Sequence, residues 1–264
     1  MKLSGKVALV TGSARGLGRA YALHLARLGA DVVINDIDLA AAKLYDEELT
    51  AETVVDEIRA LGVRCLGIVA DVTDQAQVQS MMEQIVADLG QIDILVNNAG
   101  GALVPGPSFA SSVPEADFRR MMDINLMGTI FSCQAAAEPM KRQRSGKIVN
   151  VGSQAGLRSS GGGGGTAYSV AKAAIHHYTR KLADELGPFG INVNCIAPGW
   201  ILSSRAVAGG RGTPESRARL EAEIALRRLG VPEDCAKVVE FLVTDLSDYV
   251  TGQIIPVCGG VCLF

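Results

Sequence analysis

Short apolar runs alternate with longer segments of helical periodicity along almost the whole chain. Four runs, at residues 7–10, 32–34, 63–69 and 92–96, each end on polar residues or glycine, and three more follow at 147–151, 191–196 and 254–257. Residues 16–28 and 167–186 repeat their apolar positions with a helical period. Continuous apolar strands suit a sheet that is buried on both faces. The pattern predicts an α/β fold with a doubly wound parallel sheet of the Rossmann type, in three layers α/β/α.

No linker rich in Pro or Ser and no block of charge divides the 264 residues, so we expect a single domain over residues 1–264. Residues 37–50 add an acidic, Ala-rich segment, which we interpret as an extra surface loop or helical turn rather than a dedicated binding element. The run Gly161–Gly165 should be mobile in the empty protein, because ordering five glycines costs backbone entropy. Residues of about 201–220 are expected to form a substrate loop.

Composition narrows the function classes. With 48% hydrophobic and 20% charged residues the chain can bury a sizeable core and stay soluble. A formal net charge of −3 gives no electrostatic footprint for nucleic acid or an anionic membrane. The six cysteines and three histidines lack the spacing of metal ligands, so we expect reduced thiols and no metal site. Neither a signal peptide nor a membrane-spanning stretch is evident, which favours a cytoplasmic protein.

A glycine-rich turn, Thr11-Gly12-Ser13-Ala14-Arg15-Gly16-Leu17-Gly18, follows the first predicted strand and opens a helix. This arrangement places a dinucleotide diphosphate at a helix N-terminus. Asp36 ends the next strand, where a carboxylate accepts hydrogen bonds from the ribose and repels a 2′-phosphate. NAD is therefore favoured over NADP. Arg15 could pair with a 2′-phosphate if it turned inward, or could face solvent.

The third strand ends at Asp71 and Val72, which could border the adenine. Asp71 could equally cap the following helix, and Asp74 competes with it for that role.

Tyr168 and Lys172 lie four residues apart in a predicted helix, so both project from one face. Ser153 follows the strand at 147–151 and should reach the same edge of the sheet. A free tyrosine has a pKa of about 10, so proton transfer near neutral pH requires this pKa to fall. We expect the Lys172 ammonium and the nicotinamide to lower it. The pair predicts proton exchange with a carbonyl oxygen while hydride moves at the adjacent carbon.

Taken in order along the chain, these motifs resemble the short-chain dehydrogenase/reductase family, in its compact single-domain branch. The resemblance covers essentially the whole chain and rests on the glycine-rich turn, Asn97-Asn98-Ala99-Gly100, Asn125, Ser153, Tyr168, Lys172 and Pro198-Gly199. It implies that Tyr168 is the acid and base, that Lys172 lowers its pKa and holds the nicotinamide ribose, and that Ser153 bonds the substrate oxygen. It also implies that Asn125 positions a water, and that the protein is a homo-oligomer, most simply a tetramer.

The residues and the resemblance together define the expected cofactor site: Gly12, Ser13, Arg15, Gly16, Leu17, Gly18, Asp36, Asp71, Val72, Asn98, Ala99, Gly100, Tyr168, Lys172, Pro198, Gly199, Ile201 and Ser203. The chain departs from the family pattern in three places. The interval from Ser153 to Tyr168 is a couple of residues longer than usual, Ser203 stands where threonine often follows Pro-Gly, and Cys258 replaces an aspartate before the terminal Gly-Gly.

We therefore expect an NAD(H)-dependent enzyme that interconverts a secondary alcohol and a ketone. The segment 203–219 holds Arg205, Arg211 and Arg217 and no aromatic residue, which favours a polar small molecule, such as a sugar or hydroxy acid, over a steroid. These charges could also be those of a solvated loop. Two alternatives are a 3-oxoacyl-carrier reductase using NADP(H), which Asp36 opposes, and a non-enzymatic dinucleotide sensor, against which the intact reactive residues argue.

Overall fold

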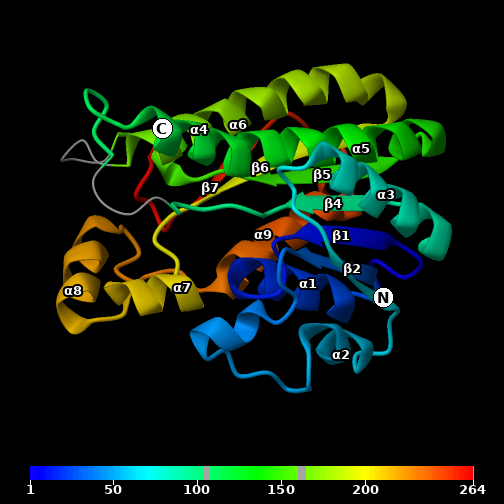
Figure 1. Cartoon of the computed structure of the whole chain (residues 1–264), viewed down its shortest axis with the longest axis horizontal. Coiled ribbons are helices and arrows are strands. Elements are labelled where there is room, and N and C mark those ends of the chain that lie inside the picture. Colours follow the sequence, from blue (N-terminus) through cyan, green and yellow to red (C-terminus); the bar gives the residue numbers. More distant parts are fainter. Residues whose placement is uncertain (104–107, 160–164, 264) are drawn as a thin grey trace.

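The computed structural model describes residues 1–103, 108–159 and 165–263 (Figure 1). They build a seven-stranded sheet, parallel throughout, in the order β3-β2-β1-β4-β5-β6-β7. The strands are β1 (Val7–Thr11), β2 (Asp31–Asp36), β3 (Cys65–Val69), β4 (Ile94–Asn97), β5 (Gly146–Val151), β6 (Ile191–Pro198) and β7 (Ile254–Val257). The predicted doubly wound parallel sheet is confirmed.

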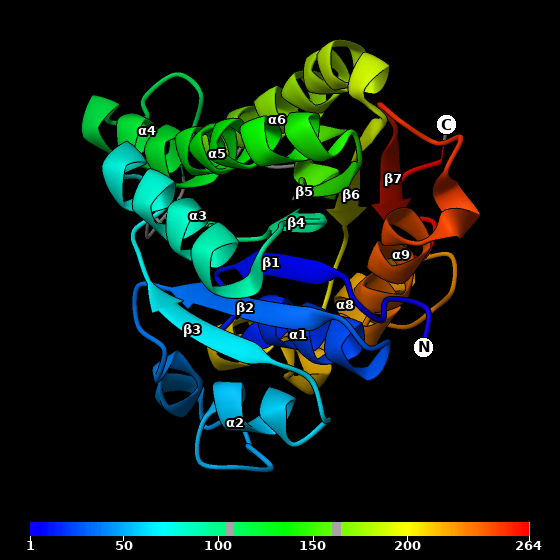
Figure 2. The ribbon, with the colours of Figure 1, turned by 90° about the vertical axis from the view of Figure 1, so that its right-hand side faces the viewer.

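Helices cover both faces of this sheet and complete the three layers (Figures 1 and 2). One face is covered by α1 (Gly16–Arg27), α2 (Val54–Arg59) and α9 (Pro232–Val243), and the other by α3 (Gln75–Leu89), α5 (Gly128–Gln143) and α6 (Thr166–Leu186). A further helix, α4 (Glu115–Met122), continues into α5 through a π-helical turn over Asp123–Met127. The strand order reverses between β1 and β4, and ligands of such sheets bind at the carboxyl ends of the strands beside that reversal.

The sheet separates two hydrophobic cores, and β1 contributes to both. Ala8 and Val10 face the core beneath α1 and α9, whereas Val7 and Leu9 face the core beneath α3 and α5. Side chains of a strand alternate between the two faces of a sheet. A strand that is covered on both faces is therefore apolar at every position, which explains the continuous runs in the sequence.

The segment expected as a substrate loop is largely helical. It contains α7 (Ser204–Ala206), a π-helical turn over Val207–Arg211 and α8 (Pro214–Glu223). Leu220 of α8 packs with Ile224 and Leu229 in a small core of its own. Both helices stand together at one end of the molecule, away from the sheet (Figure 1).

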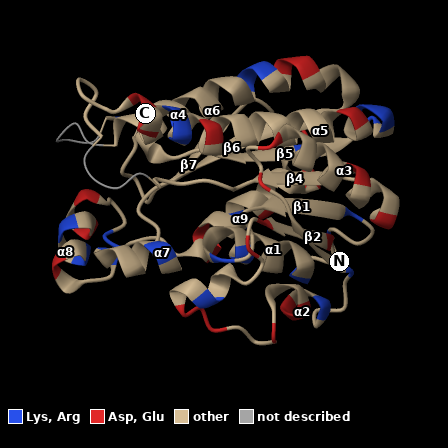
Figure 3. Cartoon of the chain, viewed as in Figure 1, with Lys and Arg blue, Asp and Glu red and all other residues tan. Residues whose placement is uncertain are grey.

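Acidic and basic residues are interspersed over the outer helices, and both α7 and α8 carry basic residues (Figure 3). Within the described residues, no helix has the length and apolar character needed to cross a membrane. All six cysteines are free thiols. Most of the glycine run, residues 161–164, lies outside the described residues, and Gly165 adopts a positive φ of 77° immediately before α6.

Candidate active site

A cleft of about 1310 Å³ opens along the carboxyl ends of the central strands. Most of the predicted site residues line it: Gly12, Arg15, Gly16, Leu17, Asp36, Asp71, Val72, Asn98, Ala99, Gly100, Ser153, Tyr168, Lys172, Pro198, Gly199, Ile201 and Ser203. Chain segments far apart in the sequence thus converge on one cavity.

Three predicted residues lie behind the cleft wall instead. Ser13 is fully buried and donates a hydrogen bond from its hydroxyl to the Val10 carbonyl at 2.6 Å. A Cβ at Gly18 would lie 2.2 Å from the Gly12 carbonyl oxygen, so glycine is required there by packing. Asn125 is likewise fully buried. The Ser13 side chain and the Gly18 Cα therefore shape the turn from behind, and the contact of these two residues with a cofactor stays a prediction.

The glycine-rich turn leaves the start of α1 able to accept an anion. Gly12 has a φ of +62°, and a Cβ there would lie 2.7 Å from the Ala99 Cα. Arg15, at the N-cap position, makes no side-chain capping bond. Among the described residues, no acceptor takes the N–H groups of Leu17 and Gly18. Free N–H groups at a helix N-terminus bind phosphate, so the turn fits a dinucleotide diphosphate.

At the end of β2, Asp36 faces the same turn. Its Oδ2 accepts a hydrogen bond from the Ala14 N–H at 3.2 Å, and its Oδ1 accepts one from the Ile37 N–H at 2.9 Å. Burial raises the pKa of Asp36, while these N–H groups and the Arg15 charge oppose the rise. The Arg15 guanidinium stacks over the Tyr45 ring, 4.4 Å from its centroid. Residues 37–50 therefore hold Arg15 beside the cleft.

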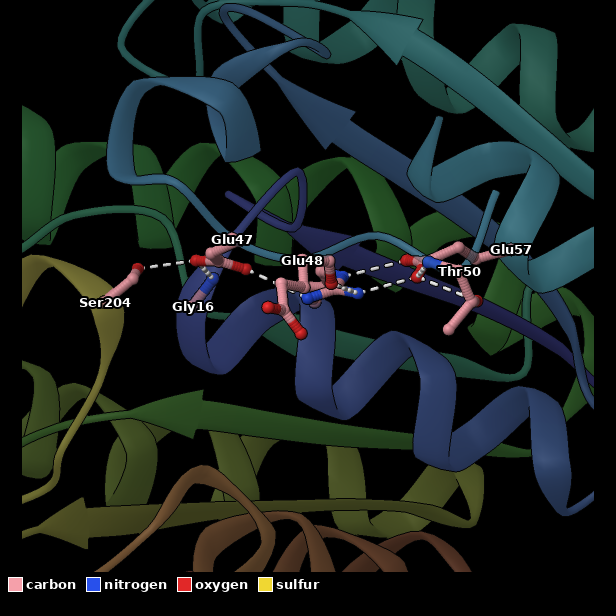
Figure 4. Close-up of polar contacts among 7 residues, drawn as sticks. Gly16, Glu47, Glu48, Thr50, Glu57 and Ser204 are labelled. Carbon is pink, nitrogen blue, oxygen red and sulfur yellow. Dashed lines mark hydrogen bonds and ion pairs between the residues drawn. The ribbon is translucent and has the colours of Figure 1, made fainter. Parts of the chain in front are cut away.

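Residues 37–50, interpreted from the sequence as an extra surface loop or helical turn, contain a 3-10 turn over Ala41–Tyr45 and also contact α1 directly (Figure 4). Glu47 Oε1 accepts hydrogen bonds from the Gly16 N–H at 2.7 Å and from the Ser204 hydroxyl at 2.5 Å. Its other oxygen pairs with Arg19 at 3.2 Å, and Arg19 in turn forms two hydrogen bonds with Glu57, at 2.7 and 2.8 Å. Glu47 thus links the glycine-rich turn to α7.

Two further predicted residues use their side chains within the framework. The Asn98 amide donates to the carbonyl oxygens of Thr11 and Gly12, at 3.0 and 2.8 Å, and so fastens the end of β4 to the turn. Asp71 accepts from the Thr73 N–H at 2.9 Å, whereas Asp74 caps α3 by accepting from the Ala76 N–H at 2.9 Å. The helix cap is therefore Asp74.

On α6, Tyr168 and Lys172 lie one turn apart, with the Lys172 Nζ 5.7 Å from the centroid of the Tyr168 ring. Lys172 is buried and donates to the Val151 carbonyl at 2.8 Å. Ser153, just beyond β5, lines the same cleft as Tyr168, and its side chain acts to lower the pKa of the Tyr168 phenol. The adjacency expected from the helical spacing is thus present.

The π-helical turn between α4 and α5 carries Asn125. Its amide donates to the carbonyl oxygens of Gly101 and Met121, both at 3.1 Å, and its Oδ1 accepts from the Gly101 N–H at 2.9 Å. Asn125 therefore fixes the chain that follows β4 at the edge of the cleft.

Groups of the protein itself act on the Tyr168 pKa in both directions. Burial raises it, and the opposing influences are the hydrogen bond to Ser153 and the charges of Arg205 and Arg211. Burial also lowers the pKa of Lys172 to about 8. Lys172 therefore shares the low-polarity environment of Tyr168, and the cations that act on the phenol in this structure come from α7 and the turn after it.

His176 is a site residue that sequence reasoning missed. It lies one turn of α6 beyond Lys172, and its Nε2 accepts a hydrogen bond from the Ser153 N–H at 3.5 Å. Burial lowers its pKa to about 4, so the ring is neutral at pH 7 and can accept. The i+4 spacing from Lys172 was the available signal. Within the described residues, no cluster of His, Cys, Asp or Glu side chains is suited to hold a metal ion.

Comparison with known proteins agrees with this geometry. A family model described as enoyl-(acyl carrier protein) reductase matches residues 12–262. The chain is 52% identical to a cyclohexanol dehydrogenase of Rhodococcus sp. (strain TK6), over 98% of this chain and 97% of the relative. It is 39% identical to the 3-oxoacyl-[acyl-carrier-protein] reductase FabG of Staphylococcus aureus (strain Mu50 / ATCC 700699), over 98% of this chain and 99% of the relative.

Among solved structures, a 7α-hydroxysteroid dehydrogenase complexed with NADH and 7-oxo glycochenodeoxycholic acid superposes with a TM-score of 0.86 at 36% identity. The match covers 98% of this chain and 95% of that one. Dehydrogenases of this kind use a nicotinamide dinucleotide, which suits the glycine-rich turn and the cleft beyond it. The chain belongs to the short-chain dehydrogenase/reductase family of oxidoreductases.

Proposed function

We propose that this protein catalyses the NAD(H)-dependent interconversion of a secondary alcohol and a ketone. The observation that carries the proposal is that Ser153, Tyr168 and Lys172 line the same cleft as the glycine-rich turn and Asp36. The bound nicotinamide supplies or takes up the hydride. Tyr168 moves the proton to or from the substrate oxygen, and the Ser153 hydroxyl orients that oxygen. His176 holds the Ser153 backbone from behind.

Lys172 and Asn125 support this chemistry. Lys172 uses one N–H on the Val151 carbonyl, and its remaining N–H groups hold the nicotinamide ribose. We further propose that, with the cofactor bound, the Lys172 ammonium stabilises the Tyr168 phenolate in addition to the charges of Arg205 and Arg211. Asn125, fixed by Gly101 and Met121, positions a water for proton relay.

We assign NAD(H) as the preferred cofactor because a carboxylate at the end of β2, Asp36, would accept hydrogen bonds from the ribose hydroxyls and repel a 2′-phosphate. The NADH complex of the hydroxysteroid dehydrogenase supports this choice. Asp36, Asp71 and Val72 border the adenosine, while Pro198, Gly199, Ile201 and Ser203 border the nicotinamide. The cyclohexanol dehydrogenase relative supports a secondary alcohol, and we assign a polar one, such as a hydroxy acid or sugar.

The second candidate is a 3-oxoacyl-carrier reductase using NADP(H), which the resemblance to FabG favours and Asp36 opposes. A dinucleotide sensor without chemistry has no use for Ser153, Tyr168 and Lys172 in one cleft. We further propose a single-domain cytoplasmic homotetramer, acting on small molecules and not on nucleic acid or membranes, with residues 201–220 as the substrate loop. Light scattering at micromolar concentration tests the assembly, and a monomer contradicts it.

The deciding experiment follows the absorbance of reduced nicotinamide while a panel of secondary alcohols and hydroxy acids is offered with NAD⁺ and, separately, with NADP⁺. We expect reduction of NAD⁺ by at least one alcohol, and no reduction in the Tyr168→Phe variant. A second assay offers 3-oxoacyl thioesters with NADPH. Turnover in this assay alone establishes the second candidate. If the protein binds a dinucleotide but turns over no substrate, it is the non-enzymatic dinucleotide sensor.

A further inference from the structure

Two partly buried arginine side chains, Arg205 and Arg211, line the substrate end of the cleft without an acidic partner among the described residues. Arg205 of α7 reaches the Gly100 carbonyl with Nη1 at 3.4 Å. It packs so closely on Gly101 that a Cβ there would lie 2.1 Å from its Nη2. Arg211 donates to the Ile201 carbonyl at 2.7 Å and stacks over Trp200, 5.2 Å from the ring centroid.

Nearby arginines are paired differently. Arg217 of α8 lies 3.5 Å from Glu221, and Arg158 lies 3.5 Å from Glu223. The C-terminal turn of α8 therefore carries carboxylates, and these pair with other arginines. Arg205 and Arg211 are left with backbone carbonyls, which carry only partial charge.

This arrangement is electrostatically unfavourable without an anion. Burial lowers the pKa of both arginines, and Arg205 further lowers that of Arg211 by repulsion. Partly buried like charges without a counter-ion destabilise a site, and a bound anion removes that repulsion. Arg205, Arg211 and Tyr168 line the same cleft, and both charges act on the Tyr168 hydroxyl, so the anion would bind in the part of the cleft that holds the reacting oxygen.

We propose that Arg205 and Arg211 form a binding site for the carboxylate of the substrate, which makes the substrate a hydroxy acid or its oxo acid. The planar fork of a guanidinium matches a carboxylate in geometry and charge. The assignment rests on the proposed function, since it takes Tyr168 as the reacting group. The cofactor diphosphate is the other anion that could reach Arg205, because Arg15 also acts on that side chain.

The test compares 3-hydroxycyclohexane-1-carboxylate with its methyl ester, which differ mainly in charge. The parent, Arg205→Gln, Arg211→Gln and Arg211→Lys are assayed with NAD⁺. Arg217→Gln serves as the matched control, because Arg217 belongs to the same loop and is paired with Glu221. We expect the ratio of kcat/KM for the carboxylate to kcat/KM for the ester to fall about tenfold or more in each Arg→Gln variant, because any effect on Tyr168 is common to both substrates. Arg211→Lys should recover part of the loss, and Arg217→Gln should match the parent.

The outcomes separate this inference from the function beneath it. If the ester is oxidised but the parent does not favour the carboxylate, the proposed function stands and the carboxylate site is wrong. Equal losses on both substrates mean that the arginines serve Tyr168 alone, and weaker NADH binding with an unchanged carboxylate-to-ester ratio assigns them to the diphosphate. Either result overturns the proposal.

A binding measurement tests the site without turnover. Trp200 is the only tryptophan of the chain and lies against Arg211, so its fluorescence reports binding at that side chain. In the parent with NADH bound, cyclohexanecarboxylate should change the fluorescence saturably, and the methyl ester should bind at least about tenfold more weakly. Arg205→Gln should raise the Kd of the carboxylate by a similar factor, while Arg217→Gln leaves it unchanged. Equal Kd values for the carboxylate and the ester contradict the proposal even if no alcohol is ever oxidised.

Discussion

Arg19, behind the glycine-rich turn, and two arginines that line the substrate end of the cleft have opposite electrostatic environments. At the cofactor end, Arg19 lies between Glu47 and Glu57, and its bonds to these carboxylates raise its pKa despite burial. At the substrate end, Arg205 and Arg211 have backbone carbonyls for partners, and burial lowers their pKa. A saturated ion pair builds framework, whereas an unpaired cation can bind a ligand. The contrast separates charges that hold the fold from charges that select a substrate.

The largest expected effect on activity is at Tyr168, which lines the same cleft as the cofactor-binding turn and the two substrate-end arginines. Tyr168→Phe should lower kcat by several orders of magnitude, because the ring still packs but the proton donor is gone. NADH affinity and the free energy of unfolding should stay near the parent values. Steady-state rates and a nicotinamide-fluorescence titration measure both. Activity within tenfold of the parent would refute the role given to Tyr168.

Glu57→Ala tests the framework end. Its carboxylate is 1% exposed, so its removal leaves Arg19 partly uncompensated and should cost about 3–5 kcal/mol of unfolding free energy. Glu48→Ala is the matched control, because Glu48 bonds Arg19 only through its carbonyl. Arg211→Gln should change stability by less than about 1 kcal/mol, since no ion pair is lost. Urea unfolding compares all three, and an equal loss in Glu57→Ala and Arg211→Gln would abolish the contrast.

An acid titration of stability tests the ion pair between Arg19 and Glu57 in a second way. Burial raises the pKa of Glu57, but its bonds to Arg19 and Thr50 outweigh this and lower it overall. Its stabilising contribution is therefore complete above the unfolded pKa, about 4.3, and is lost as pH falls through the lower folded value. The stability gap between parent and Glu57→Ala should narrow in that window. A gap that does not change down to the lowest pH would contradict the pairing.

Asp36→Ala should raise kcat/KM for NADP(H) relative to NAD(H) by about tenfold or more, because a ribose acceptor and a repulsive charge both disappear. Rates with the two cofactors at equal substrate concentration give the ratio. If the parent already prefers NADP(H), Arg15 decides the selectivity and the role of Asp36 is wrong.

The smallest effect is expected at Glu47, whose carboxylate lies on the Gly16 N–H beside the predicted diphosphate position. Glu47→Gln keeps an acceptor there and removes the charge, so NADH should bind a few-fold more tightly at low salt, with a smaller gain at high salt. Glu48→Gln is the control. Weaker NADH binding in Glu47→Gln would show that the link from Gly16 to Ser204 matters more than the repulsion.

Local pattern determined much of this molecule. The apolar runs predicted all seven strands, although β3 and β4 begin two residues later than their runs, since period and burial act over a few neighbouring residues. The i, i+4 spacing likewise placed Tyr168 and Lys172 together, and strand ends brought Ser153 and Asp36 to one cleft. The local sequence pattern therefore predicts the positions of strands and helices and the residues that are neighbours within them.

Contacts between irregular segments were decided only by the tertiary structure. Glu47 bonds Ser204, 157 positions away in the sequence, and the Tyr45 ring stacks on Arg15. The pattern of apolar residues in 37–50 predicts neither contact. The inward turn of Ser13 and the raised pKa of Tyr168 also follow from burial, which depends on what packs from elsewhere. The pairing of an arginine can be equally non-local: Arg158 meets Glu223 across 65 positions, whereas Arg211 bonds the Ile201 carbonyl and has no carboxylate partner among the described residues.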